Sequence, residues 1–318
     1  MKKVAILTSG GDAPGMNACL RAAVRCALNK GIEPYVVYDG YKGLVEGKIL
    51  QVHRRFVSEI LNRGGTLIGT ARLDEFKEPH IREKALSNLY NLGINDLIVI
   101  GGDGSFRGAI DLNNMGLHCV GVCATIDNDI NAPGYSVGFD SALNTIVECI
   151  DRIRDTSSSH TRCSIVEVMG RHCGDLALYS SIACGADILI DPVVGYDMNK
   201  IIEDIKRMKH EGRKHVLIVV SENVLDVKEL AKTIEKETGF EARSTVLGYL
   251  QRGGVPSAMD RVTASVLGYS AVDYLLNKKY GKMVYFANNH VFDLPLEEVV
   301  QQKNIDYQQL YKVNDIIG

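Results

Sequence analysis

Two acidic residues, Asp127 and Asp129, lie two positions apart in the segment Thr125–Asp129, just after a short apolar run. In an extended chain both carboxylates point to the same side. There they repel each other unless a cation or a proton transfer occupies them. Phosphoryl transfer from a nucleotide to an alcohol uses such a pair, because one carboxylate accepts the hydroxyl proton and another holds magnesium. A surface Asx turn explains the same residues, so both interpretations stay open on this motif alone.

A glycine-rich segment, Gly101–Ser105, follows the apolar run Leu97–Ile100. Glycines there let backbone N–H groups approach a phosphate, because no Cβ stands in the way. A tight turn between strand and helix also explains the glycines but not Asp103, whereas a carboxylate beside phosphates is expected where Mg²⁺ bridges the two. The segment is neither a Gly-x-x-x-x-Gly-Lys-Ser/Thr loop nor a Gly-x-Gly-x-x-Gly fingerprint, since position 107 is Arg. We interpret it as a phosphate-binding turn of another kind.

Several charged residues lie in or beside predicted loops that contain Gly, Ser or Thr. A single loop arginine is usually solvated surface, but five of them would suit doubly charged phosphates, which a guanidinium binds through two hydrogen bonds. Glu222 follows another buried run and is placed either to accept hydrogen bonds from sugar hydroxyls or to cap local structure. The five arginines are Arg72, Arg162, Arg171, Arg243 and Arg252.

The elements that must position these residues are short apolar runs alternating with helical segments. Continuous apolar strands between helices predict an α/β fold with a parallel sheet covered on both faces. Ligands bind beyond the carboxyl ends of such strands, where we expect the polar clusters to converge. Helical spacing and end signals predict helices over 14–30 and 141–154. The predicted strands are Val4–Leu7, Leu97–Ile100, Cys119–Cys123, Ile165–Val168 and Val216–Val220.

Length and composition limit the class of protein. A chain of 318 residues exceeds what one core usually holds, so two α/β units or one large unit are expected. The net charge of −3 gives no general attraction to nucleic acid or anionic lipid. The apolar runs are far shorter than the roughly 18 residues of a membrane helix, and the first apolar run is too short for a secretory signal. Eight cysteines without a Cys-x-x-Cys motif indicate reduced thiols and a cytoplasmic protein.

A zinc site is a second interpretation of one cysteine-containing segment. His118, Cys119 and Cys123 are close in sequence, but they lie on and just after a predicted buried strand with no fourth ligand nearby. Core packing is therefore favoured, and no structural metal is expected.

Five motifs, in their order along the chain, resemble those of the bacterial ATP-dependent 6-phosphofructokinases. The resemblance extends through most of the chain and is weaker after about residue 285. The resemblance implies transfer of the γ-phosphoryl group of MgATP to the C1 hydroxyl of fructose 6-phosphate, the committed step of glycolysis. It also implies two doubly wound, Rossmann-like α/β domains in a homotetramer, with active and effector sites at subunit interfaces. We expect an ATP-binding domain over 1–138 with a return at about 251–300, a fructose 6-phosphate-binding domain over 139–250, and a C-terminal tail over 301–318. The motifs are Gly10–Asn17, Gly101–Ser105, Thr125–Asp129, Met169–Arg171 and Gln251–Gly254.

The resemblance also implies roles for individual residues. Asp127 would be the general base toward the C1 hydroxyl, beside Thr125, while Asp103 and Asp129 would lie at the metal. Gly11, Arg72 and Arg171 would stabilise charge on the transferred group. ATP would be bound by Gly11, Arg72, Leu73, Gly102, Asp103, Gly104 and Ser105. The sugar phosphate would be bound by Thr125, Ile126, Asp127, Met169, Gly170, Arg171, Glu222, Tyr249, Leu250, Gln251 and Arg252, with Arg162 and Arg243 from the neighbouring chain.

Three residues depart from the family pattern near the active site. Tyr249 stands where the family usually has a sugar-binding His, Ala124 replaces a usual Gly, and Leu73 replaces a frequent Phe. A phenol donates hydrogen bonds as a neutral imidazole does but cannot become cationic near neutral pH. We expect these changes to alter affinity rather than reaction type.

The family's effector site, where ADP activates and phosphoenolpyruvate inhibits, is also matched. Arg21 and Arg25 lie four apart and share a helix face, which a solvated surface explains as well. Glu211 replaces a usual Lys, and Asp187 a usual Glu that holds the effector's magnesium, so we expect weak responses to both effectors. The matched positions are Arg21, Arg25, Arg54, Glu59, Arg154, Gly185, Asp187, Glu211, Arg213, Lys214 and His215.

Rival functions remain to be separated. Pyrophosphate-dependent phosphofructokinases usually carry Asp in place of Gly104 and Lys in place of Ala124, so the sequence favours ATP. An NAD kinase would leave the sugar-phosphate arginines without a purpose. A nicotinamide dehydrogenase would need the missing dinucleotide fingerprint, and an inactive nucleotide sensor would not be expected to keep all three aspartates.

Overall fold

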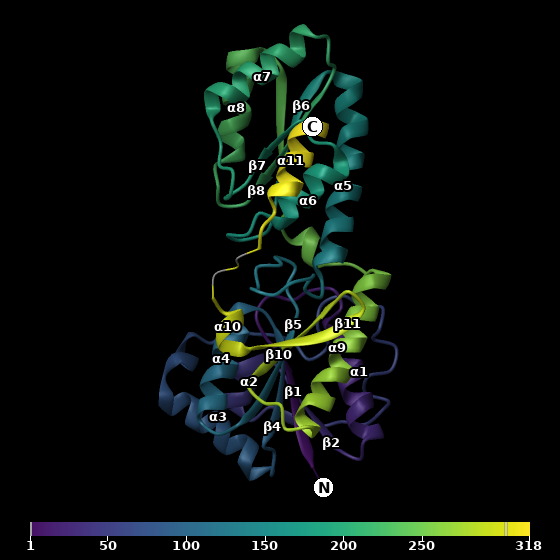
Figure 1. Ribbon diagram of the computed structural model, residues 1–318, viewed down its shortest axis with the longest axis vertical. Helices are drawn as coiled ribbons and strands as arrows, with labels where there is room; N and C mark the ends of the chain where they lie inside the picture. Colours follow the sequence, from purple (N-terminus) through teal and green to yellow (C-terminus); the bar gives the residue numbers. More distant parts are fainter. Residues whose placement is uncertain (1, 302, 304) are drawn as a thin grey trace. The chain divides into compact units, whose positions relative to one another are not determined.

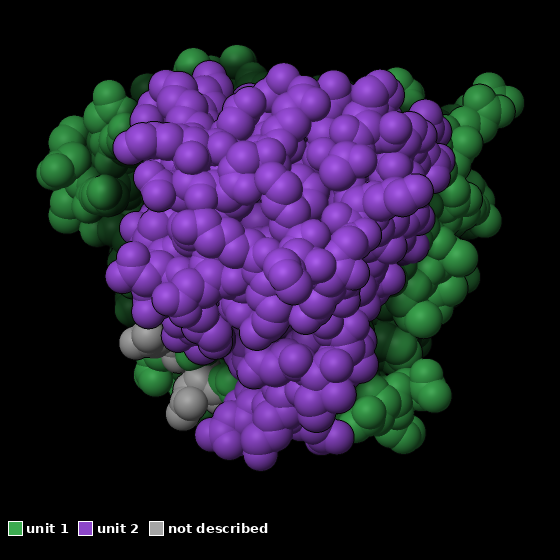
Figure 2. Space-filling model, turned by 90° about the horizontal axis from the view of Figure 1, so that it is seen from above, with its two compact units in different colours: residues 1–126, 130–141, 252–305 green, residues 127–129, 142–251, 306–318 purple. Residues whose placement is uncertain are grey.

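The apolar runs of the sequence form strands of two separate sheets. The computed structural model describes residues 2–301, 303 and 305–318. The chain divides into unit 1, residues 1–126, 130–141 and 252–305, and unit 2, residues 127–129, 142–251 and 306–318, shown in separate colours in Figure 2. Of the predicted C-terminal tail, residues 302 and 304 lie outside the described residues, and 306–318 belong to unit 2.

Unit 1 is built on a seven-stranded sheet in the order β11-β10-β5-β4-β1-β2-β3. The inner strands pair in parallel, whereas β3 and β11 at the two edges are antiparallel to their neighbours. The sheet packs against helices through a core that includes Leu7, Leu97 and Phe106. The strands are β1 Lys3–Thr8, β2 Glu33–Val37, β3 Ile49–Gln51, β4 Asp96–Gly101, β5 His118–Cys123, β10 Lys282–Ala287 and β11 His290–Pro295; the helices are α1 Met16–Asn29, α2 Gly40–Glu46, η1 Asp74–Lys77, α3 Pro79–Asn91, α4 Asp103–Asn114, α9 Ala258–Leu276 and α10 Leu296–Val299.

Unit 2 is built on a four-stranded, fully parallel sheet in the order β7-β8-β6-β9. Ile165, Ile218 and Ile234 belong to a core that the strands form with α7 and α8, and α11 packs beside α6 (Figure 1). The strands are β6 Arg162–Val168, β7 Ile188–Ile190, β8 Val216–Ser221 and β9 Glu241–Val246; the helices are α5 Phe139–His160, α6 Asp175–Cys184, α7 Met198–His210, α8 Val227–Thr238, η2 Gly248–Arg252 and α11 Gln308–Ile317.

The sequence predictions of fold class, strands and helices are confirmed. Each unit carries a mainly parallel sheet with helices, and all five predicted strands lie within observed ones. Helix α1 begins two residues later than predicted and α5 extends from 139 to 160. The five strands are divided between two sheets, because β1, β4 and β5 belong to one sheet and β6 and β8 to the other. Five apolar runs do not reveal how strands are shared between sheets.

The segment with a possible zinc site lies in the core of unit 1. Cys119 and Cys123 are buried, and burial raises the pKa of the Cys119 thiol well above its usual value. His118 Nδ1 lies 2.9 Å from Asp96 Oδ1, and its ring stacks on Tyr280 with centroids 3.9 Å apart. These contacts account for the three residues by packing. Among the described residues, no helix is both long enough and apolar enough to cross a bilayer.

Helix α9 fixes the start of α5 and packs closely on α1. The Asp260 carboxylate accepts hydrogen bonds from the backbone N–H groups of Gly138, at 2.9 Å, and Ser141, at 2.8 Å, which satisfies donors at a helix N-terminus. On the same helix, a Cβ added at Gly268 would lie 2.4 Å from the Cys19 carbonyl oxygen of α1. Glycine at this position therefore sets how closely the two helices approach.

Replacement of Gly268 by alanine should separate these helices. We expect Gly268→Ala to destabilise the protein by about 1–3 kcal/mol, because the new methyl group meets backbone that cannot rotate away. Thermal or denaturant unfolding measures this, with Ser265→Ala on the same helix as the control. Equal stability of the Gly268→Ala variant and the wild type would show that the α1–α9 distance is not set by this glycine.

Candidate functional site

Three neighbouring strands of unit 1 end at the same edge of the sheet. β1, β4 and β5 are parallel, with Thr8 opposite Ile100 and Gly101 opposite Cys123. The turns that follow them therefore lie side by side at the carboxyl edge, where open α/β sheets bind ligands. Three of the predicted motifs are brought together in this way: residues 9–12, 101–105 and 124–126.

Helix α4 begins at this edge and presents its N-terminus there. Gly102 is its extended N-cap residue and makes no side-chain cap, so the first N–H groups and the positive end of the helix dipole are available to an anion. A Cβ added at Gly102 would lie 3.4 Å from Thr125 Cβ, whereas one at Gly104 would have no protein atom within 4 Å. Glycine at position 104 is therefore not demanded by packing within the chain, which leaves this space to a ligand.

Ser105 lies inside the turn rather than on its surface. A Cβ added at Gly101 would lie 2.4 Å from Ser105 Oγ, and one at Gly10 would lie 3.2 Å from it. The Tyr41 hydroxyl donates a 2.6 Å hydrogen bond to the Ser105 carbonyl, and burial raises the pKa of this tyrosine well above its usual range, so the donor keeps its proton. Tyr41 thus holds the glycine-rich turn through this hydrogen bond. The sequence analysis did not find Tyr41, because it belongs to no recognised motif.

Asp103 stands in the first turn of α4 and is partly exposed. Its carboxylate pairs with Arg107, whose Nη2 lies 3.0 Å from Asp103 Oδ1 and donates to the Val300 carbonyl, also at 3.0 Å. A partly exposed carboxylate beside an anion-binding helix end is the kind of oxygen donor that Mg²⁺ takes together with phosphates. The chemistry of this position therefore fits a metal–nucleotide complex.

The loop that carries Arg72 is hydrogen-bonded to the same edge. Asn17 of α1 donates to the Arg63 carbonyl and accepts from the Leu67 N–H at 2.7 Å. Thr70 donates a 2.8 Å hydrogen bond to the Gly10 carbonyl. These bonds hold the segment just before Arg72 against the turn that follows β1. Leu73, next along the chain, packs on the core of unit 1.

Arg252 lies directly on the backbone of Gly11. A Cβ added at Gly11 would lie 1.8 Å from Arg252 Nη1, so only glycine admits the guanidinium there. Sequence reasoning gave Gly11 to ATP and Arg252 to the sugar phosphate. The structure brings the two residues together within unit 1.

The acidic motif leaves unit 1 after Ile126. Ser136 Oγ donates a 2.5 Å hydrogen bond to the Thr125 carbonyl. Asp127 is buried, and Asn128 adopts the left-handed conformation with φ 51°. Asp129 Oδ2 accepts from Arg171 Nη1 at 3.0 Å. Two predicted site residues far apart in sequence, Asp129 and Arg171, are thus paired in unit 2.

Glu222 holds the turn after β6 in an unusual conformation. Gly170 and Arg171 both have positive φ, 141° and 54°, which costs energy for a residue with a side chain. Glu222 Oε1 accepts from the N–H of Gly170 at 3.1 Å and of Arg171 at 2.7 Å. The capping role that the sequence left open for Glu222 is therefore present.

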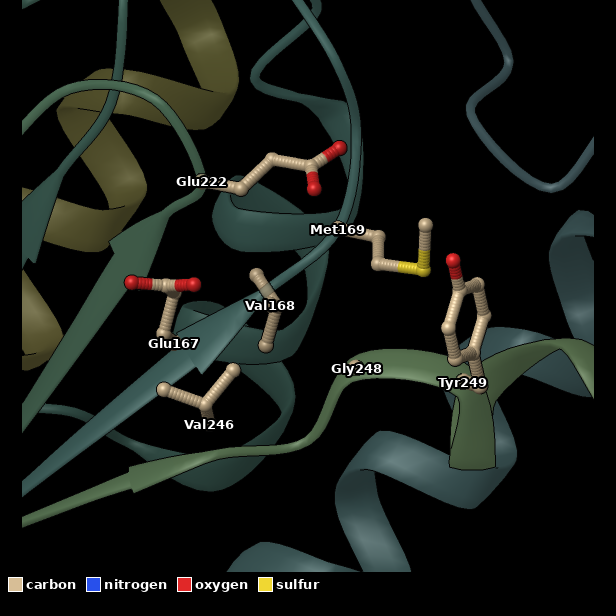
Figure 3. Close-up of a pocket in the computed structure, with 7 residues that line it drawn as sticks. All are labelled: Glu167, Val168, Met169, Glu222, Val246, Gly248 and Tyr249. Atoms are coloured by element: carbon tan, nitrogen blue, oxygen red, sulfur yellow. The ribbon is translucent and has the colours of Figure 1, made fainter.

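A cavity of about 160 Å³ opens beside this turn (Figure 3). The side chain of Met169 extends toward the ring of Tyr249, which is 83% exposed. Glu167, a lining residue that sequence reasoning missed, has its pKa raised by burial first and then by Glu222 and Asp226. The lining residues are Glu167, Val168, Met169, Glu222, Val246, Gly248 and Tyr249.

Two further predicted sugar-phosphate residues follow Tyr249. Gln251 is fully buried, and its amide accepts from the Met169 N–H and donates to the Gly248 carbonyl, both at 3.0 Å. Leu250 is exposed. Gln251 therefore fixes the two backbone segments that border the cavity.

Arg162 and Arg243 lie on two neighbouring strands of the unit 2 sheet. Arg162 is the first residue of β6 and Arg243 lies inside β9, so the expectation of a loop position is wrong for Arg243. Both pair with Glu241, Arg162 Nε at 3.0 Å and Arg243 Nη2 at 2.5 Å. At about 3.3 Å per residue, Arg162 is roughly 20 Å along β6 from Val168 at the cavity. Arg243 lies three residues before the cavity residue Val246, and its guanidinium pairs with Glu241 at the amino end of β9.

The predicted effector residues form a set in each unit. In unit 1, the pKa of Arg25 is lowered by burial and by the nearby charges of Arg21 and Arg54. The three guanidinium groups therefore lie near one another. Glu59 follows with a positive φ of 59°.

In unit 2 the effector positions gather around the end of α6. Arg154 donates to the carbonyls of Cys184 and Gly185, and Asp187 pairs with Arg213. Glu211 is exposed at the C-terminal end of α7, with its Oε1 3.9 Å from Arg207 Nε. Lys214 is exposed and His215 half-buried.

A family model and several known proteins match nearly the whole chain. The model of the family described as phosphofructokinase matches residues 3–275. The ATP-dependent 6-phosphofructokinase of Vibrio parahaemolyticus is 50% identical over 314 residues, 98% of each chain. The ATP-dependent 6-phosphofructokinase 1 of Clostridium perfringens is 50% identical over 318 residues, 100% of each chain.

Solved structures agree. The phosphofructokinase of Saccharomyces cerevisiae has a TM-score of 0.87 and 36% identity, covering 94% of this chain, which spans 45% of the yeast chain. A pyrophosphate-dependent phosphofructokinase of Marinobacter aquaeolei, with a TM-score of 0.86 over 97% of this chain and 86% of its own, is only 22% identical and shares the fold. With its glycine-rich turns, its paired acids and these relatives taken together, the chain belongs to the phosphofructokinase family.

Proposed function

We propose that the chain transfers the γ-phosphoryl group of ATP to the C1 hydroxyl of fructose 6-phosphate, giving fructose 1,6-bisphosphate and ADP. The observation that carries the proposal is the carboxyl edge of β1, β4 and β5, where two glycine-rich turns and an open helix N-terminus lie beside Thr125. Relatives that are 50% identical over nearly the full chain are named as ATP-dependent 6-phosphofructokinases. A coupled assay of ADP release with and without fructose 6-phosphate tests this proposal. An equal rate of ADP release in the absence of the sugar phosphate would contradict it.

The donor half lies in unit 1. The N–H groups at the start of α4 bind phosphate oxygens, and the space at Gly104 accommodates the nucleotide. Asp103 would hold Mg²⁺ together with the phosphates, and Asp129 is the second carboxylate that we assign to the metal. When bound, the ion neutralises charge on the phosphates as the phosphoryl group leaves ADP. Arg72 and the Gly11 N–H add positive charge at the transferred group.

The acceptor half lies mainly in unit 2. Asp127 removes the proton of the C1 hydroxyl, and the hydroxyl oxygen then attacks the γ-phosphorus. Arg171, turned toward Asp129 by the Glu222-bonded backbone, stabilises the negative charge that develops. The cavity bordered by Met169 and Tyr249 receives the sugar. Gln251 positions this border rather than touching the sugar, since both ends of its amide already bond backbone.

The 6-phosphate needs cations, which we assign to two chains. Arg162 is separated from the cavity by the length of β6, and both Arg162 and Arg243 pair with Glu241 at the amino end of β9. This supports their action on the sugar phosphate of a neighbouring copy, beside that copy's own Arg252. A homotetramer with shared sites meets this need. As the committed step of glycolysis, the reaction places the enzyme in the cytoplasm.

The effector site binds ADP or phosphoenolpyruvate through the two cationic sets. Arg21, Arg25 and Arg54 attract a phosphate group; the pKa of Arg25 is lowered first by burial and then by the charges of Arg21 and Arg54, so three cations lie near one another. Asp187 is engaged with Arg213, and Glu211 adds a negative charge at the rim, so effector binding is weak.

Loss of the general base should stop the chemical step. We expect Asp127→Ser to lower kcat by about 10²–10⁴ while the KM for fructose 6-phosphate stays near that of the wild type, because the phosphate-binding cations remain. Steady-state kinetics measure both constants, with the exposed Asp151→Ser on α5 as the control. A variant with more than about a tenth of wild-type kcat would show that Asp127 is not the base.

A negative charge at position 104 should act against the nucleotide. We expect Gly104→Asp to raise the KM for ATP at least about tenfold through repulsion of the phosphates. The unfolding temperature should not fall, because an added Cβ meets no protein atom within 4 Å. Gly104→Asn, equal in size but neutral, is the matched control. Equal KM values for the two variants would mean that charge at this position does not select the nucleotide.

Reversal of the charge at the effector rim should strengthen regulation. We expect Glu211→Lys to tighten activation by ADP and inhibition by phosphoenolpyruvate by about 5- to 150-fold. Saturation curves for fructose 6-phosphate at several effector concentrations give the apparent constants, with Glu203→Lys, a charge reversal on the same helix, as the control. If the wild type already responds strongly to micromolar effector and Glu211→Lys leaves that response unchanged, the assignment of Glu211 to the effector site is wrong.

A further inference from the structure

The C-terminal helix carries a polar face for which the proposed function has no use. Tyr307, Tyr311 and Asn314 follow each other at intervals of four and three residues, so they share one side of α11 and the turn before it. Each makes a hydrogen bond to a side chain of unit 2: the Tyr307 hydroxyl to Asp175 Oδ2 at 2.8 Å, the Tyr311 hydroxyl to Asp191 Oδ2 at 2.7 Å, and Asn314 Oδ1 from Ser181 Oγ at 2.7 Å.

Buried carboxylates make two of these bonds important. Asp175 is 3% and Asp191 0% exposed, and a buried carboxylate needs donors to offset its lost hydration. Burial raises the pKa of both tyrosines well above their usual range, so each hydroxyl keeps the proton that it donates. Helix α11 therefore supplies donors that the interior of unit 2 requires.

The two carboxylates differ in what else they hold. Asp191 Oδ1 accepts from the N–H groups of Val193 and Val194, both at 2.9 Å, in the turn after β7. Asp175 Oδ2, the atom that Tyr307 contacts, also accepts a 2.8 Å hydrogen bond from Asn128 Nδ2. Asn128 stands between Asp127 and Asp129. Of these two tyrosine contacts, it is the Tyr307 contact that continues into the acidic motif.

Asn128 is the residue whose conformation directs its two neighbours. Its φ of 51° is left-handed, a region that asparagine tolerates and that requires support from the surroundings. The amide–Asp175 bond gives that support. A rotation of the backbone at Asn128 would turn the carboxylates of Asp127 and Asp129 away from their present directions.

We propose that Tyr307 is a positioning residue for catalysis: its hydroxyl fixes Asp175, which fixes Asn128 and so the directions of Asp127 and Asp129. The inference rests on the proposed function, in which these two aspartates act on the hydroxyl and near the metal. Helix α11 is then part of the catalytic apparatus, although its sequence lies beyond the region in which the family motifs occur.

The test compares two tyrosines that lose the same kind of bond. We expect Tyr307→Phe to lower kcat about 10- to 100-fold, because small displacements of reacting groups carry penalties of this size. The KM values for ATP and fructose 6-phosphate should change by less than about threefold. Tyr311→Phe removes an equivalent bond from the same helix but not from the acidic motif. It should lose similar thermal stability and keep kcat within about twofold.

A second substitution breaks the same connection from its other end. Asn128→Gly keeps the backbone conformation accessible but removes the amide, and it leaves α11 bonded. Its kcat should fall by a similar factor, and the double variant with Tyr307→Phe should fall no further, because the two side chains act in series. Asn128→Gly combined with Tyr311→Phe should be no worse than Asn128→Gly alone.

The outcomes separate the inference from the proposed function. If Tyr307→Phe retains wild-type kcat, or if its effect adds to that of Asn128→Gly, the positioning role is overturned even though Asp127→Ser is inactive. If Asp127→Ser itself remains active, the assigned chemistry fails first. A kcat loss of equal size in Tyr307→Phe and Tyr311→Phe would mean that α11 contributes stability alone.

Discussion

Buried carboxylates and their demand for donors determine how the active segments of unit 2 are held. A carboxylate removed from water must recover its hydration from hydrogen bonds inside the protein. Asp175 recovers it from Asn128, Tyr307 and Cys173. The Asp175 carboxylate thereby joins three segments that are far apart in sequence: the acidic motif, the start of α6 and the C-terminal helix. The position of each segment depends on hydrogen bonds to this carboxylate.

Several charged residues assigned to ligand binding form ion pairs within this structure. Asp103 pairs with Arg107, Asp129 with Arg171, and Asp187 with Arg213; Glu241 pairs with both Arg162 and Arg243. Each of these charges is thus compensated by a partner of opposite sign, which offsets part of the hydration that it loses in the fold.

The direction of the parallel strands in unit 2 separates two groups of candidate site residues. Parallel strands place all their carboxyl ends on one side, so residues at the amino ends are separated from the ligand edge by the strand length. Met169 and Glu222 lie at the carboxyl ends of β6 and β8, and Arg162 lies at the amino end of β6. Arg162 and Met169 are therefore separated by the full length of β6.

The sequence by itself determined much of the fold, because continuous apolar runs of four or five residues have few alternatives to buried strands. It also indicated the family, because five motifs in a fixed order resemble those of phosphofructokinases; these motifs include glycines with a positive φ, such as Gly10 at 83° and Gly170 at 141°. What it did not determine was which strands share a sheet, since hydrogen-bond partners of a strand lie outside its own residues. Nor did it reveal Tyr41, Glu167 or Tyr307, whose contacts lie 64, 55 and 132 residues away in sequence. The tertiary structure alone decided these, because a buried polar group is specified by the partner that the fold brings to it and not by its neighbours along the chain.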